Sequence, residues 1–102
     1  MKEIPYKQFG QLFKKLRLQA EIASLTEFGR LLASKSYIVE DSFLSHWQTG
    51  RKIPKRREVL LVLISIFREK INHLTIGEIN NFLESANQGN LTDKELKTLQ
   101  LF

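Results

Sequence analysis

The stretch that decides the fold is Leu44-Ser45-His46-Trp47-Gln48-Thr49-Gly50-Arg51-Lys52-Ile53-Pro54. Its first half predicts the end of a short helix, because Gly50 is typical of the position after a helix and Pro54 favours the start of the next element. At about 100° per residue, Leu44, Trp47 and Gln48 share one side of this helix, which we expect to face the core. The opposite side carries short polar side chains, at Ser42, Ser45, His46 and Thr49.

This polar side of the helix is suited to contact with nucleic acid. Side chains that both donate and accept hydrogen bonds can touch base edges and phosphates without holding the helix away from a groove. Trp47 could stack on a base, but its place on the inner side favours the core. Asp41 or Ser42 is expected to cap the start of the helix.

A basic cluster follows the helix directly. Five cations occur in seven residues, namely Arg51, Lys52, Lys55, Arg56 and Arg57. Residues 1–70 hold fourteen Lys and Arg against seven Asp and Glu, whereas residues 71–102 hold two against four. Beside a short recognition helix, such a cluster could straddle a phosphate backbone. A basic surface attracts polyanions, although on charge alone a merely soluble basic surface is an equally good interpretation.

Outward from this stretch, the rest of the chain also indicates helices. An apolar stripe at helical spacing runs from Phe9 to Ala20, and Ser24 with Glu27 forms a capping-box pattern for a second helix, in which Gly29 indicates close packing. A fourth helix is expected from about Arg56 to Lys70, apolar on most sides and therefore central. Capping boxes also begin at Thr75 and Thr92.

We therefore predict an all-α fold. It is a compact helical bundle. The predicted organisation is a helical core over residues 1–70 and a helical extension over residues 71–102 that packs on the core or follows it. The apolar end, Leu99-Gln100-Leu101-Phe102, slightly favours continuation into a further domain over packing back on the bundle.

Residues 9–67 resemble the helix-turn-helix domain of lambda-repressor-like, or XRE-family, regulators. The resemblance is carried by Phe9-Gly10-Gln11-Leu12 with Leu16-Arg17, by Leu25-Thr26-Glu27-Phe28-Gly29 and by Arg57-Glu58-Val59-Leu60. Most specific is the stretch 44–54, which is similar to the family pattern hydrophobic-Ser-x-Trp-Glu-x-Gly-x-x-x-Pro. Residues 71–102 resemble, more weakly, a helical tail that follows this domain in some multi-domain regulators.

The resemblance implies a bundle of five core helices that contains a helix-turn-helix over residues 1–70, with one further short C-terminal helix. It also implies that the third helix lies in the major groove of DNA. It implies that Ser42, Ser45 and His46 lie towards the bases, and that Thr49, Arg51 and Lys52 lie towards phosphates. The family usually has a glutamate where Gln48 stands, paired with an arginine that matches Arg17, so a hydrogen bond is expected here in place of an ion pair. The connection from Ala33 to Asp41 is also longer than the family's usual turn.

These observations predict sequence-specific binding of double-stranded DNA by a domain of a transcriptional regulator. The alternative is a protein–protein interaction module on the same scaffold. Negative charge at Glu40 and Asp41 favours that alternative, which would show an exposed apolar patch at Phe43, Tyr37 and Ile38. The family often binds two half-sites as a homodimer, but no dimer surface is evident in the sequence.

No enzyme activity, metal or cofactor is expected. The two histidines, His46 and His73, lie on different segments, and the chain has no cysteine, no HExxH pattern and no glycine-rich phosphate loop. The apolar run Val59–Ile66 is too short to span a bilayer, and the N-terminal residues lack the apolar region of a signal peptide. We therefore expect a cytoplasmic, nucleoid-associated protein without membrane contact.

Overall fold

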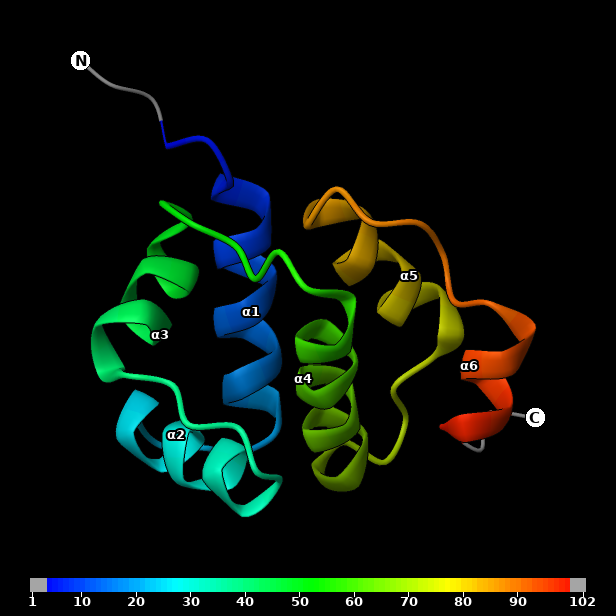
Figure 1. The fold of residues 1–102 in the computed structure, drawn as a ribbon, viewed down its shortest axis with the longest axis horizontal. Coiled ribbons are helices and arrows are strands. Elements are labelled where there is room, and N and C mark those ends of the chain that lie inside the picture. Colours follow the sequence, from blue (N-terminus) through cyan, green and yellow to red (C-terminus); the bar gives the residue numbers. More distant parts are fainter. Residues whose placement is uncertain (1–3, 100–102) are drawn as a thin grey trace.

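The computed structural model describes residues 4–99, and within them it contains six helices and no strand. The helices are α1 (Lys7–Gln19), α2 (Leu25–Ser34), α3 (Asp41–Thr49), α4 (Arg57–Lys70), α5 (Ile76–Ser85) and α6 (Asp93–Thr98). In Figure 1, α1 and α4 run through the middle, with α2 and α3 on one side and α5 and α6 on the other. The predicted all-α bundle is confirmed.

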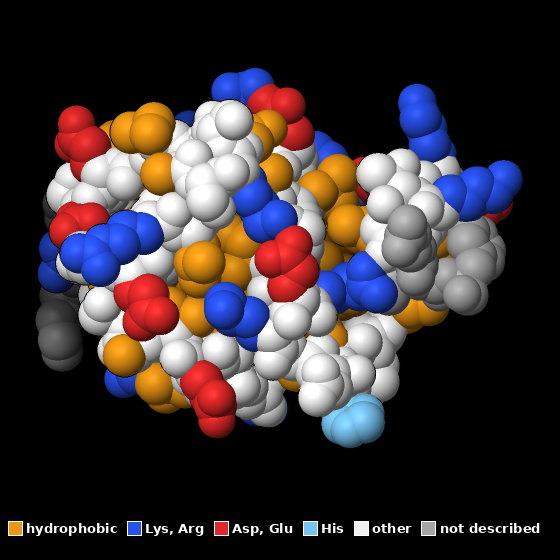
Figure 2. All heavy atoms as spheres, turned by 90° about the horizontal axis from the view of Figure 1, so that it is seen from below, with side chains coloured by type: hydrophobic (Ala, Val, Ile, Leu, Met, Phe, Trp, Pro, Cys, Tyr) orange, Lys and Arg blue, Asp and Glu red, His pale blue; other side chains and the backbone are white. Residues whose placement is uncertain are grey.

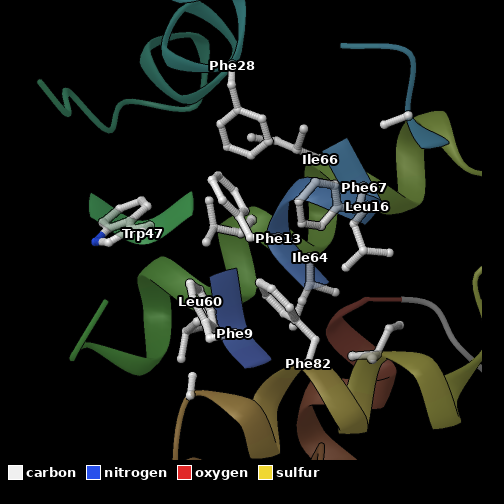
Figure 3. Close-up of a cluster of buried hydrophobic side chains, with 14 of the residues drawn as sticks. Phe9, Phe13, Leu16, Phe28, Trp47, Leu60, Ile64, Ile66, Phe67 and Phe82 are labelled. Carbon is white, nitrogen blue, oxygen red and sulfur yellow. The ribbon is translucent and has the colours of Figure 1, made fainter. Parts of the chain in front are cut away.

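One aromatic cluster joins most of the helices. Phe9 and Phe13 of α1 reach α5 and α2, because the ring centroids of Phe9 and Phe82 lie 5.0 Å apart and those of Phe13 and Phe28 lie 5.1 Å apart. Phe67 of α4 completes the cluster at 5.8 Å from Phe82 (Figure 3). Edge-to-face and offset pairs of this kind stabilise a core beyond their buried area. The core is therefore continuous from α1 to α5.

The sixth helix stands outside this core. None of the residues of α6 is buried, whereas α5 buries Ile79, Phe82 and Leu83. The prediction of five core helices and one further short helix is confirmed. Of residues 71–102, α5 thus belongs to the core, α6 lies on its margin, and Gln100–Phe102 lie outside the described residues.

The helix starts follow the sequence closely. Thr75 and Thr92 both form the predicted capping boxes, each accepting a hydrogen bond from the backbone N–H of a glutamate three residues on. Ser24 likewise accepts from the N–H of Glu27 at 3.1 Å, but the Glu27 carboxylate accepts from the N–H of Ala23. The box at α2 therefore reaches one residue further back than predicted.

Three helices end on residues that are not glycine but adopt a left-handed backbone. Glu21, Ser36 and Asn87 have φ of 59°, 70° and 61°, and they follow α1, α2 and α5. The left-handed region costs about 1–2 kcal/mol for an ordinary residue, because Cβ approaches a carbonyl oxygen, and asparagine tolerates it better. No helix in residues 4–99 is long and apolar enough to cross a membrane.

Candidate nucleic-acid interface

Helix α3 lies at the edge of the bundle. Leu44 is fully buried on its inner side, and Trp47 is 6% exposed with its ring centroid 6.3 Å from that of Phe13. Figure 3 shows the Trp47 ring directed into the aromatic cluster, as predicted. The outer side carries the residues predicted to contact DNA, with Ser42, Ser45 and Thr49 exposed and His46 half-buried. In Figure 1, α3 stands at one margin of the molecule, and no other helix of residues 4–99 lies beyond it there.

Two glycines bring α1 and α3 into backbone contact. A Cβ added to Gly10 would lie 2.6 Å from the carbonyl oxygen of Gln48 and 2.8 Å from the nitrogen of Gly50. Gly50 itself ends α3 with φ of 82°, and its carbonyl oxygen accepts a hydrogen bond from the N–H of Tyr6 at 2.8 Å. Only glycine fits where two backbones approach this closely. The pose of α3 on the bundle is therefore fixed by backbone contacts.

A buried arginine adds a polar link between the same helices. Arg17 is 7% exposed, and its Nε donates to Oε1 of Gln48 at 3.0 Å while its Nη1 donates to the carbonyl of Ile22 at 2.7 Å. The hydrogen bond that was expected in place of an ion pair is present. Gly10, Arg17, Gln48 and Gly50 are called the α3 joint below.

The start of α3 differs from the prediction. Neither Asp41 nor Ser42 caps the helix, because Glu40 is the N-cap residue and makes no side-chain capping bond. Asp41 is the first helical residue, and its carboxylate accepts a hydrogen bond from the hydroxyl of Thr26 on α2 at 3.3 Å. Gly29 of α2 packs against the same helix, since a Cβ added there would lie 3.4 Å from the Leu44 side chain. Asp41 thus has a partner on α2, and the side chains of both Glu40 and Asp41 are exposed at this end of the helix.

Most of the basic cluster is exposed, on the segment that leads from the end of α3 to the start of α4. Arg51 and Lys52 continue from the helix, and their N–H groups donate to the carbonyl of His46 at 2.9 and 3.3 Å. Lys55 is exposed, and Arg56 is exposed although it pairs with Glu58. These four cations, Arg51, Lys52, Lys55 and Arg56, are called the basic segment below. Backbone bonds to α3 position its first two members relative to the polar side of the helix.

Arg57 belongs to a different environment. Its Nε and Nη2 donate to the two carboxylate oxygens of Glu95 at 3.0 and 2.7 Å. Its guanidinium also donates to the carbonyls of Gly89 and Asn90, at 2.7 and 3.0 Å. The N–H donors of this guanidinium are therefore largely engaged within the protein. Arg57, Gly89, Asn90 and Glu95 are called the α6 joint below.

The ion pair of the α6 joint shifts the pKa of both its members. The hydrogen bond from Arg57 is the main reason that the pKa of Glu95 is lowered to about 2. The same bond raises the pKa of Arg57 above its ordinary value. A bidentate pair of this kind has little capacity left for a phosphate. In the sequence Arg57 belongs to the cluster of five cations. In the structure its bonds to Glu95 and to two carbonyls distinguish it from the other four.

Positive charge is not gathered everywhere on the surface. Figure 2 shows the end of the molecule that lies lowest in Figure 1, where Lys and Arg side chains stand among Asp and Glu with hydrophobic side chains between them. Positive and negative charges are therefore interspersed at this end of the molecule.

Within residues 4–99 no group of three or more His, Asp or Glu side chains is placed to hold a metal ion.

Sequence reasoning missed two contributors to this region. Gly10 was assigned no role, although it permits the backbone contact between α1 and α3. Thr26 was not linked with Asp41, because a hydrogen bond across fifteen residues leaves no local pattern.

No family model, no curated protein sequence and no solved structure matches the chain. What it binds must therefore be inferred from the arrangement of its own side chains.

Proposed function

We propose that the chain binds double-stranded DNA in a sequence-specific way as a domain of a transcriptional regulator, with α3 in the major groove. The observation that carries the proposal is the uncovered polar side of α3 joined to the exposed basic segment. A helix with its side chains is about 10–12 Å across, which fits a major groove about 12 Å wide. The inner side of α3 is fixed on the core, so only the outer side is free to enter a groove.

Each group of side chains has a role in the proposed complex. Ser42, Ser45 and His46 contact base edges, since they lie on the outer side of α3 and can donate or accept hydrogen bonds. Thr49 and the basic segment contact phosphates, because they lie at the end of the helix where it would leave the groove. Arg57 is left out of the phosphate contacts, since Glu95 and two carbonyls already hold it.

The second candidate is a protein-interaction module. It is supported by exposed apolar side chains beside α3, with Ile38 at 85% and Phe43 at 46% exposure. Tyr37, the third residue of the expected patch, is partly buried and packs against the core. Glu40 also remains exposed at the start of α3. A partner protein would contact these residues together with Lys52, whose ammonium lies over the Phe43 ring, and leave the rest of the basic segment free.

Titration of isotope-labelled protein with duplex DNA at low salt separates the two candidates. DNA binding predicts amide shifts at residues 42–56 that fade as salt is added. In a plot of the logarithm of the binding constant against the logarithm of the salt concentration, the slope should be about −0.9 for each phosphate contacted. Each alanine substitution in the basic segment should therefore make this slope shallower by about one. Lys70→Ala, at the far end of α4, is the matched control and should leave the slope unchanged. If saturating duplex moves no amide in residues 42–56, the DNA proposal is wrong.

A further inference from the structure

Phe43 is an aromatic residue that the core does not use. It lies on α3 between Ser42 and the buried Leu44, and its side chain is 46% exposed. At about 100° per residue it stands about 60° from His46, on the flank of the polar side. A half-exposed phenylalanine on a short helix forgoes part of the stabilisation that burial would give. Its position therefore calls for an explanation outside the fold.

The environment of the ring points to a polyanionic partner. The ammonium of Lys52 lies 5.8 Å from the centroid of the Phe43 ring, within the range of a cation–π interaction. Lys52 belongs to the basic segment, and its N–H is bonded to the carbonyl of His46. An apolar protein surface docked on the ring would have to remove water from this ammonium, which is unfavourable. A partner that offers an apolar group to the ring and a phosphate to the ammonium avoids this cost, because the phosphate then pairs with Lys52.

The major groove of DNA offers that combination. Thymine presents its 5-methyl group there, and phenylalanine is among the side chains that contact it. We propose that Phe43 recognises the methyl group of one thymine while Lys52 lies towards a phosphate near it. The proposal rests on the DNA binding proposed above and adds one specificity-determining residue to it. Ser42 and Ser45 are short enough to let the ring approach the base.

The test replaces thymine by uracil, which removes only the methyl group. Duplexes that bind the full chain are first selected from a random-sequence library, and each thymine of the selected site is then replaced in turn. At one position we expect affinity to fall about fourfold, equivalent to about 0.8 kcal/mol for one buried methyl group. Phe43→Ala should bind the thymine and uracil forms of that position equally, and Phe43→Leu should retain part of the difference.

Ile38→Ala is the matched control, because it removes an exposed apolar side chain next to α3 without touching the helix. It should keep the full fourfold difference. Circular dichroism melting of each variant establishes that the bundle is intact. If the library yields duplexes but no position responds to uracil, or Phe43→Ala keeps the response, Phe43 does not recognise the methyl group. If no duplex is selected at all, the DNA proposal fails together with this inference.

Discussion

Arg17 and Arg57 each tie a helix to a segment distant in sequence, but the partners differ in charge. Arg17 is buried and donates to neutral oxygens, those of the Gln48 amide and the Ile22 carbonyl. Arg57 is 27% exposed and donates to the Glu95 carboxylate as well as to carbonyls. The α3 joint also has backbone contact, and α3 itself buries Leu44 and Trp47, whereas no residue of α6 is buried.

The two helices α3 and α6 are thus held on the molecule in different ways. Helix α3 is held by the packing of its inner side, which depends little on pH or salt. Helix α6 is held by the packing of Leu91 and Leu99, which flank it, and by the bonds of Arg57 to Glu95 and to two carbonyls. The ion pair among these contacts responds to both pH and salt. The surface proposed to bind DNA is therefore the one whose pose is least sensitive to solution conditions.

The largest effect should come from breaking the α3 joint with Gly10→Ala. The new Cβ would lie 2.6 Å from a backbone oxygen, so α1 and α3 must move apart. We expect a loss of about 2–3 kcal/mol in the free energy of unfolding, because overpacking outweighs the better helix propensity of alanine. Urea unfolding followed by Trp47 fluorescence measures it.

Gly77→Ala is the control for this change, because a Cβ there would meet nothing closer than the Thr75 hydroxyl at 3.8 Å. It should be neutral or slightly stabilising, since alanine favours a helix more than glycine does. Equal destabilisation by the two substitutions would mean that the backbone contact at Gly10 does not hold α3.

The second effect sharpens the contrast between adjacent arginines. Arg57→Ala leaves Glu95 and two carbonyls without their donors, and we expect a loss of about 2 kcal/mol. Arg56→Ala should change stability by less than about 0.5 kcal/mol, because the side chains of Arg56 and Glu58 are 73% and 48% exposed. Thermal unfolding of the two variants checks this, and similar losses would contradict the separate roles given to these residues.

The smallest effect is that of acid on the α6 joint. The ordinary pKa of Glu95 is 4.5 and its value in the folded protein is about 2. A lowered pKa gives stability that is fully present above the ordinary value and is lost as the pH falls towards 2. Between about pH 6 and about pH 3 we expect a loss of about 1 kcal/mol from this group, after allowance for solvent screening.

Glu95→Gln should remove that part of the pH dependence and leave the rest. The emission of Trp47, the one tryptophan in the chain, should not follow the titration, because it reports on the α3 joint. A change in Trp47 emission over the same pH range as the loss at α6 would show that the two joints are coupled. The α3 joint would then share the sensitivity of α6 to acid.

Sequence patterns predicted those parts of the fold that depend on local chemistry. Helical spacing located the core positions Phe9, Phe13 and Leu44, and the capping residues Thr75 and Thr92 located two helix starts. Gly50 located the end of α3, because its left-handed backbone is a local requirement. Each of these signals is contained within a few residues.

The parts that could not be predicted depend on contacts between distant segments. Arg57 was indistinguishable from Arg56 in the sequence, because its partner Glu95 lies on another helix. Asp41 was expected to cap α3, but the hydroxyl of Thr26 on α2 offers its carboxylate a tertiary partner. An exposed Phe43 was expected only for a protein-interaction module, and its 46% exposure is set by how α3 packs on the bundle.

The left-handed residues that end α1 and α2 have a consequence for protein engineering. Glu21 and Ser36 occupy backbone conformations that glycine adopts without steric penalty, and both side chains are exposed. Neither residue belongs to the α3 joint, the α6 joint or the basic segment. Natural sequences seldom occupy every stabilising option open to their fold. Replacing Glu21 or Ser36 with glycine should thus raise the melting temperature of the domain. The surface proposed to bind DNA would keep every one of its side chains.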